Sequence, residues 1–148
     1  MKNEETTSRL DDILEDVHTE KEADDYISSH TTEAGSRSFP EYLSEYAALH
    51  DLKTSDIIRR SRLNTNYVYN IINKVTQHPG RDKILALCIG AGMNRKETDR
   101  ALRIAGHSPL YAKDERDVRI IICINNEMND VLDVNLYLEK HKMDIIDI

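Results

Sequence analysis

Hydrophobic residues recur at spacings of three and four along most of the chain, which predicts amphipathic helices. The segment 54–73 carries two opposed stripes at this spacing. The inward stripe consists of Tyr67, Val68, Ile71 and Ile72, and the outward stripe of Asn66, Tyr69, Asn70 and Asn73. A solvated helix face usually carries Lys and Glu, so an outward row of amides with a phenol is typical of a binding surface.

The same spacing, together with capping residues, predicts helices near residues 38–50, 54–61, 65–73, 80–90, 95–105, 114–126 and 129–141. Ser38, Asn64 and Gly80 are suited to begin three of them. In the last helix we expect Val131, Leu132, Val134, Leu136 and Leu138 to be buried. The predicted fold class is therefore all-α.

A short pattern repeats in the second half of the chain. Five residues recur at an offset of 35, namely Asp82, Cys88, Ile89, Met93 and Asn94 as Asp117, Cys123, Ile124, Met128 and Asn129. Each set spans a helix, a turn and the start of a second helix. We therefore predict a duplicated helical hairpin, in which the last two helices stack on the preceding pair.

Charge divides the chain into three parts. Residues 1–39 hold 4 Lys or Arg against 11 Asp or Glu, residues 40–113 hold 12 against 7, and residues 114–148 hold 4 against 9. A basic module thus lies between two acidic arms, although the net charge of the chain is −7. We predict an acidic leader over 1–37 that is partly disordered and holds a short amphipathic helix, whose apolar residues are Leu10, Ile13, Leu14 and Val17.

Composition and residue spacing argue against several classes of function. No apolar run approaches the roughly 20 residues of a membrane span, and the acidic start lacks the apolar centre of a secretory signal, so we expect a cytoplasmic protein. Cys88 and Cys123 lie in apolar helical stretches and are interpreted as buried thiols. The six His residues show no metal-like spacing, and no nucleophile–base pair or phosphate loop is evident. We predict no metal, no cofactor and no enzymatic activity.

A short helix, the turn Arg62-Leu63-Asn64 and a helix with one polar face form the order of a helix-turn-helix. From residue 38 to about 105 the chain resembles the five-helix lambda-repressor-like, or XRE-type, family. The resemblance rests on the stretch HPGRDKILALCIGAGM and on the apolar residues Leu52, Ile57, Ile58, Leu63, Val68 and Ile71. The whole chain further resembles helix-turn-helix proteins of Gram-positive bacteria. These likenesses predict a DNA-binding domain over 38–106 and a C-terminal helical extension over 107–148.

Two positions depart from the family pattern. Arg62 stands where the turn usually has glycine, and Lys74 stands where glycine commonly follows the third helix. A left-handed residue other than glycine costs on the order of 1 kcal/mol. We therefore expect either this conformation at Arg62 or a slightly altered turn.

The resemblance implies that Thr65, Asn66 and Asn70 read bases and that Thr54 anchors a phosphate. Asparagine can bond adenine N6 and N7 together, and Tyr69 can reach a phosphate or stack, so we add Tyr69 to the base-reading face. Basic and polar residues near the helix ends are suited to phosphates. The predicted phosphate-binding set is Lys53, Thr54, Arg59, Arg62, Asn73, Lys74, His78 and Arg81.

We therefore expect a transcriptional regulator that binds double-stranded DNA. The alternatives are an adaptor, or an antitoxin-like protein, that uses the helix-turn-helix or the acidic arms to bind protein. The leader is either a solubilising tail, a competitor for the basic face or the site of a protein partner. The run Ile120–Ile124 covers more than one helix face, so its helix is either central to the monomer or lies at a subunit interface. We expect a homodimer through the C-terminal helices.

Overall fold

The computed structural model describes residues 11, 13–24 and 37–148, and the chain divides into two units, Met1–Arg37 and Ser38–Ile148. In the first unit residues 13–15 and 20–24 are helical, and the Thr19 hydroxyl accepts a hydrogen bond from the Glu22 backbone N–H. The predicted leader helix falls partly on these residues; the rest of that prediction lies outside the described residues.

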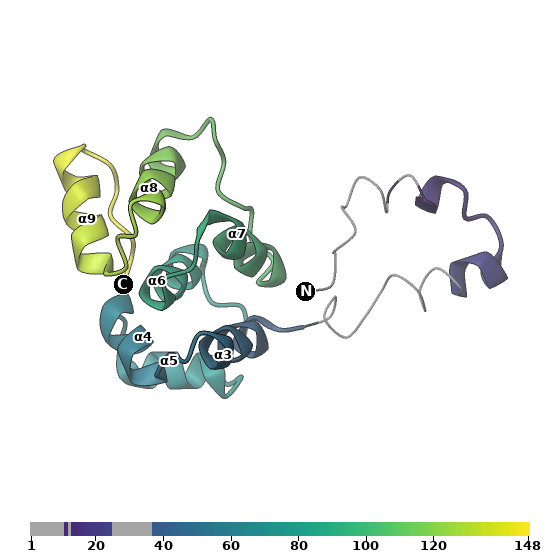
Figure 1. Ribbon diagram of the computed structural model, residues 1–148, viewed down its shortest axis with the longest axis horizontal. Coiled ribbons are helices and arrows are strands. Elements are labelled where there is room, and N and C mark those ends of the chain that lie inside the picture. Colours follow the sequence, from purple (N-terminus) through teal and green to yellow (C-terminus); the bar gives the residue numbers. More distant parts are fainter. Residues whose placement is uncertain (1–10, 12, 25–36) are drawn as a thin grey trace. The chain divides into compact units, whose positions relative to one another are not determined.

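In the second unit, residues 38–148, the secondary structure consists of helices without a strand, which confirms the all-α class for this part of the chain (Figure 1). None of the helices that the structure describes has both the length and the apolar character to traverse a bilayer. The helices are α3 (Phe39–Leu49), α4 (Thr54–Ser61), α5 (Thr65–Ile72), α6 (Arg81–Ala91), α7 (Arg95–Ile104), α8 (Glu115–Asn125) and α9 (Val131–Lys140). Each lies within two residues of its predicted bounds.

Helix α6 is the centre of the core, and α4, α7 and α9 pack against it (Figure 1). Its residues from Ile84 to Ala91 are all buried, as a helix that is apolar on every side requires. Gly90 lies at the crossing with α4. A Cβ atom built there would be 2.6 Å from the Ile57 carbonyl oxygen and 2.9 Å from the Ser61 backbone nitrogen. Glycine is therefore needed for the close approach of these two helices.

The turn between α4 and α5 depends on Arg62. Its φ of 63° is left-handed, which confirms one of the two predicted conformations; Lys74, at the other departure from the family pattern, also has a positive φ of 61°. In this conformation the Arg62 guanidinium donates to both carboxylate oxygens of Asp130, at 2.9 and 2.7 Å. Asp130 is also the N-cap of α9. The C-terminal hairpin is thereby tied to the turn that positions α5.

Two arginine–aspartate pairs support the predicted hairpin duplication. Arg81 and Asp82 are the first two residues of α6, and Arg116 and Asp117 are the second and third of α8. Arg81 binds Asp117 with an Nη2–Oδ2 distance of 2.9 Å, and Arg116 binds Asp82 with a distance of 3.0 Å. The exchange is reciprocal, because the arginine of each hairpin binds the aspartate of the other.

The segments that follow α7 and α9 repeat this correspondence at an offset of 36. Arg81 donates to the carbonyls of Ser108 and Pro109, and Arg116 donates to those of Asp144 and Ile145. A second matched pair of bonds holds each segment to its helix: Leu110 N–H donates to Asp99, and Ile146 N–H donates to Asn135. The segments after α7 and α9 are thus held to their hairpins by matching bonds, which supports the predicted duplication.

The packing of the C-terminal hairpin differs from the sequence prediction at two positions. Leu132 and Leu136 were expected in the core but are 47% and 58% exposed. The inward stripe of α9 is instead Val131, Val134, Asn135 and Leu138. This spacing turns positions 132 and 136 outward. In α8 the residues Ile120, Ile121 and Ile124 are buried within the chain itself, so a subunit interface is not needed to cover them.

Candidate nucleic-acid interface

Helix α5 presents one buried and one exposed face, as its sequence predicts. Asn64 begins the helix by accepting a hydrogen bond from Tyr67 N–H, and Val68 and Ile71 are completely buried. On the opposite side the side chain of Tyr69 is 44% exposed. The exposed residues of this face are Thr65, Asn66, Tyr69, Asn70 and Asn73, which we call the amide face. No described segment covers it.

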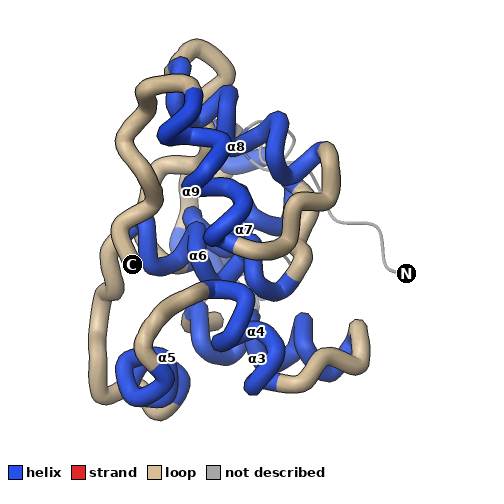
Figure 2. The backbone as a smooth tube through the Cα atoms, turned by 90° about the vertical axis from the view of Figure 1, so that its left-hand side faces the viewer, coloured by secondary structure: helices blue, strands red, loops and turns tan. Residues whose placement is uncertain are grey.

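The position of α5 leaves this face accessible to a large partner. The helix packs against α3 on its inner side. Both views place it at one end of the unit, away from α8 and α9 (Figures 1 and 2). A B-form major groove is about 12 Å wide and admits one such helix when it stands at the edge of a domain.

Seven of the eight predicted phosphate-binding residues are exposed around α4 and α5: Lys53, Thr54, Arg59, Arg62, Asn73, Lys74 and His78. Lys53 and Thr54 lie at the N-terminus of α4, where backbone N–H groups favour anions. Arg59 pairs with Asp56 within the same helix, and Lys74 pairs with Glu41 of α3 at 2.8 Å. Such exposed pairs are weak and exchange readily with other ligands.

The prediction that Arg81 binds phosphate is wrong. Its guanidinium binds Asp117 and the carbonyls of Ser108 and Pro109, and its side chain is only 26% exposed. These bonds occupy it within the fold, so we remove it from the phosphate-binding set. Arg62 is more exposed, at 40%, but its hydrogen bonds to Asp130 engage it too. They lower the pKa of the Asp130 carboxyl, so this pair stays charged at neutral pH.

Sequence reasoning missed the acidic partners of these arginines. Asp130 and Asp117 are 68 and 36 residues away from Arg62 and Arg81. A signal for the second pair was present, because Arg81 and Arg116 also follow the offset of 35. Recognising a repeated Arg-Asp dipeptide would have indicated a structural role for both arginines.

The other candidates for site chemistry in the described part of the chain are the cysteines and possible metal ligands. Both cysteines are buried free thiols, as predicted. Burial raises the pKa of Cys88 and raises the pKa of Cys123 to about 11, so neither is a reactive thiolate at neutral pH. Among the described residues, no three His, Cys, Asp or Glu side chains gather into a group that could hold a metal.

Comparisons of the chain with protein-family models, with curated proteins and with solved structures found no match.

Proposed function

We propose that the protein is a regulator that binds double-stranded DNA through a lambda-repressor-like helix-turn-helix, with α5 in the major groove. The observation that carries the proposal is the outward amide face of α5. Asn66 and Asn70 lie one turn apart on it and are exposed. An asparagine amide can bond adenine N6 and N7 together, so two of them on one exposed face suit the reading of bases.

The surroundings of the amide face support the same function. The cationic side chains of Lys53, Arg59 and Lys74 are exposed near the ends of α4 and α5, and the His78 imidazole is exposed in the loop after α5. Contacts of this kind to phosphates supply most of the affinity for a duplex and make it dependent on salt. The Arg62–Asp130 pair holds the turn between the helices, so α5 is presented at a fixed angle.

We further propose that the protein binds DNA as a homodimer. Leu132 and Leu136 form an exposed pair one turn apart on α9, and the duplicated positions on α7 are Lys96 and Arg100, which are also exposed. Because the same unit accepts charged residues there, the fold itself does not require leucine at these places. A homodimer through the C-terminal hairpin would bury the leucines, and DNA-binding dimers read two half-sites about one helical turn apart.

Selection of bound duplexes from a random pool tests this function. We expect the full-length protein to enrich one sequence with adenines in each of two inverted half-sites. Its affinity for that duplex should fall steeply with salt, with a slope of roughly −0.9 per phosphate contacted. Failure to enrich any sequence at low salt would exclude sequence-specific duplex binding and favour an adaptor that binds protein through the same face.

A further inference from the structure

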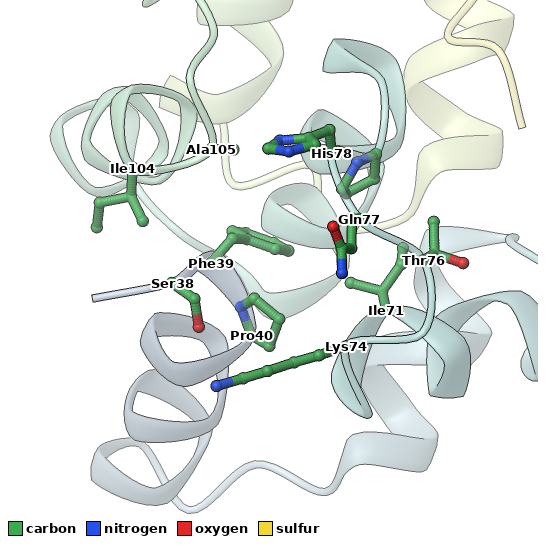
Figure 3. Close-up of a pocket in the computed structure, with 11 residues that line it drawn as sticks. Ser38, Phe39, Pro40, Ile71, Lys74, Thr76, Gln77, His78, Ile104 and Ala105 are labelled. Carbon is green, nitrogen blue, oxygen red and sulfur yellow. The ribbon is translucent and has the colours of Figure 1, made fainter. Parts of the chain in front are cut away.

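A pocket of about 300 Å³ lies behind α5 and is not used by the proposed DNA contact (Figure 3). The start of α3, the end of α5, the loop that follows α5 and the end of α7 all contribute to it. Its apolar lining consists of Phe39, Pro40, Ile71, Pro79, Ile104 and Ala105. An apolar cavity of roughly 150 Å³ holds benzene, so this pocket has room for a molecule about twice that size.

The lining of the pocket offers a positive charge and no negative one. Lys74 carries the charge, His78 adds an imidazole, and none of the described lining residues carries a carboxylate. Figure 3 shows these two side chains on opposite sides of the pocket, with Lys74 beside Pro40 and His78 near Ala105. Glu41 binds Lys74 from outside the lining at 2.8 Å, and both partners are at least half exposed. An anionic ligand can therefore compete for this lysine.

The loop after α5, which forms one wall of the pocket, has an unusual backbone conformation and is bonded to the body at its end. Lys74 and His78 both have positive φ, of 61° and 57°, a conformation that residues other than glycine rarely adopt. The His107 imidazole Nε2 lies 2.8 Å from the Pro79 carbonyl oxygen and so joins the end of the loop to the segment after α7. Backbone held in this way is found preferentially at ligand sites and switch segments.

We propose that this pocket binds a small, mainly apolar organic anion, such as an aromatic acid. The rings contact the apolar lining, and the acid group lies at the rim near Lys74. Ligand binding does not depend on the proposed DNA contact. Its consequence does rest on that function: a ligand touches Ile71, the last inward residue of α5, and so alters the affinity of the amide face for duplex.

Titration with anilinonaphthalene sulfonate, a fluorescent aromatic sulfonate, tests the site in the full-length protein. We expect saturable binding at one site per chain. Ala105→Phe fills the pocket and should weaken binding by about tenfold or more, a loss of the size expected when a site is blocked. Ala48→Phe, at an exposed position of α3, should leave it unchanged. Thermal unfolding of each variant confirms that it is folded under the assay conditions.

The charge requirement is tested separately with N-phenylnaphthylamine, which has the same rings without the sulfonate. Wild type should prefer the sulfonate, and Lys74→Gln should reduce that preference while leaving the neutral compound bound as before. Equal binding of the sulfonate by wild type and folded Ala105→Phe would overturn the site. If the probe binds as expected but no duplex is ever bound, the ligand site stands and only its effect on DNA is lost.

Discussion

Replacing Asp117 with alanine is expected to destabilise the folded unit by about 3 kcal/mol, the low end of the range for a broken buried ion pair. Asp117 is only 5% exposed and accepts hydrogen bonds from Arg81 and from Tyr111 N–H. Its removal leaves the Arg81 guanidinium partly buried without a counter-charge. Chemical denaturation monitored by circular dichroism measures the change.

The internal repeat offers controls for this substitution. Asp82→Ala removes the duplicated carboxylate, whose side chain is 26% exposed, so water replaces it more readily and the loss should be smaller. Asp56→Ala removes an exposed partner of Arg59 and should change stability by at most about 0.5 kcal/mol. A loss of stability at Asp117 no larger than at Asp56 would contradict the structural role of the Arg81–Asp117 pair.

Because Arg81 acts within the fold, Arg81→Ala should not alter the salt slope of DNA binding.

Gly90→Ala is expected to reduce stability by about 3 kcal/mol, the upper part of the range for overpacking. The new methyl group would lie 2.6 Å from the Ile57 carbonyl oxygen, and no side-chain rotation relieves a contact with backbone. Helix α4 must therefore move away from α6. The better helix propensity of alanine, worth about 1 kcal/mol, does not offset this. Thermal and denaturant unfolding report the loss.

Gly80→Ala is the matched control for this change. Gly80 precedes α6 with an ordinary φ of −64°, and a Cβ there meets no atom within 4 Å. Its stability should stay within about 0.5 kcal/mol of wild type, because the reduced entropy of the unfolded chain offsets a poorer N-cap. Equal effects of the two substitutions would show that α4 and α6 do not cross as closely as described.

The sequence predicted most of the local structure because its signals are local. Spacing and caps placed the helix bounds, Asn64 and Ser38 both cap as expected, and the left-handed conformation of Arg62 is one of the two that we expected where the family has glycine. The prediction failed at Leu132 and Leu136, because hydrophobicity alone does not distinguish the inward stripe of α9 from its neighbours.

Local sequence patterns did not predict the contacts between segments that lie far apart in the chain. The partner of Arg81 lies in another helix, so charge and position near a loop suggested a phosphate contact instead. The pocket behind α5 draws on four segments, and only their packing creates it. The repeat was visible in the sequence as matched residues, but the reciprocal ion pairs between the two hairpins required the coordinates.

The most direct test of the account measures how well the protein discriminates between its selected duplex and one with scrambled bases, at fixed salt. Wild type and Asn125→Ala, which changes an exposed asparagine at the end of α8, should discriminate equally. Asn66→Ala and Asn70→Ala should each lose about tenfold or more of this discrimination, since one good bidentate contact is worth about 1–3 kcal/mol. Unchanged discrimination in both variants would contradict the claim that the amide face of α5 reads DNA.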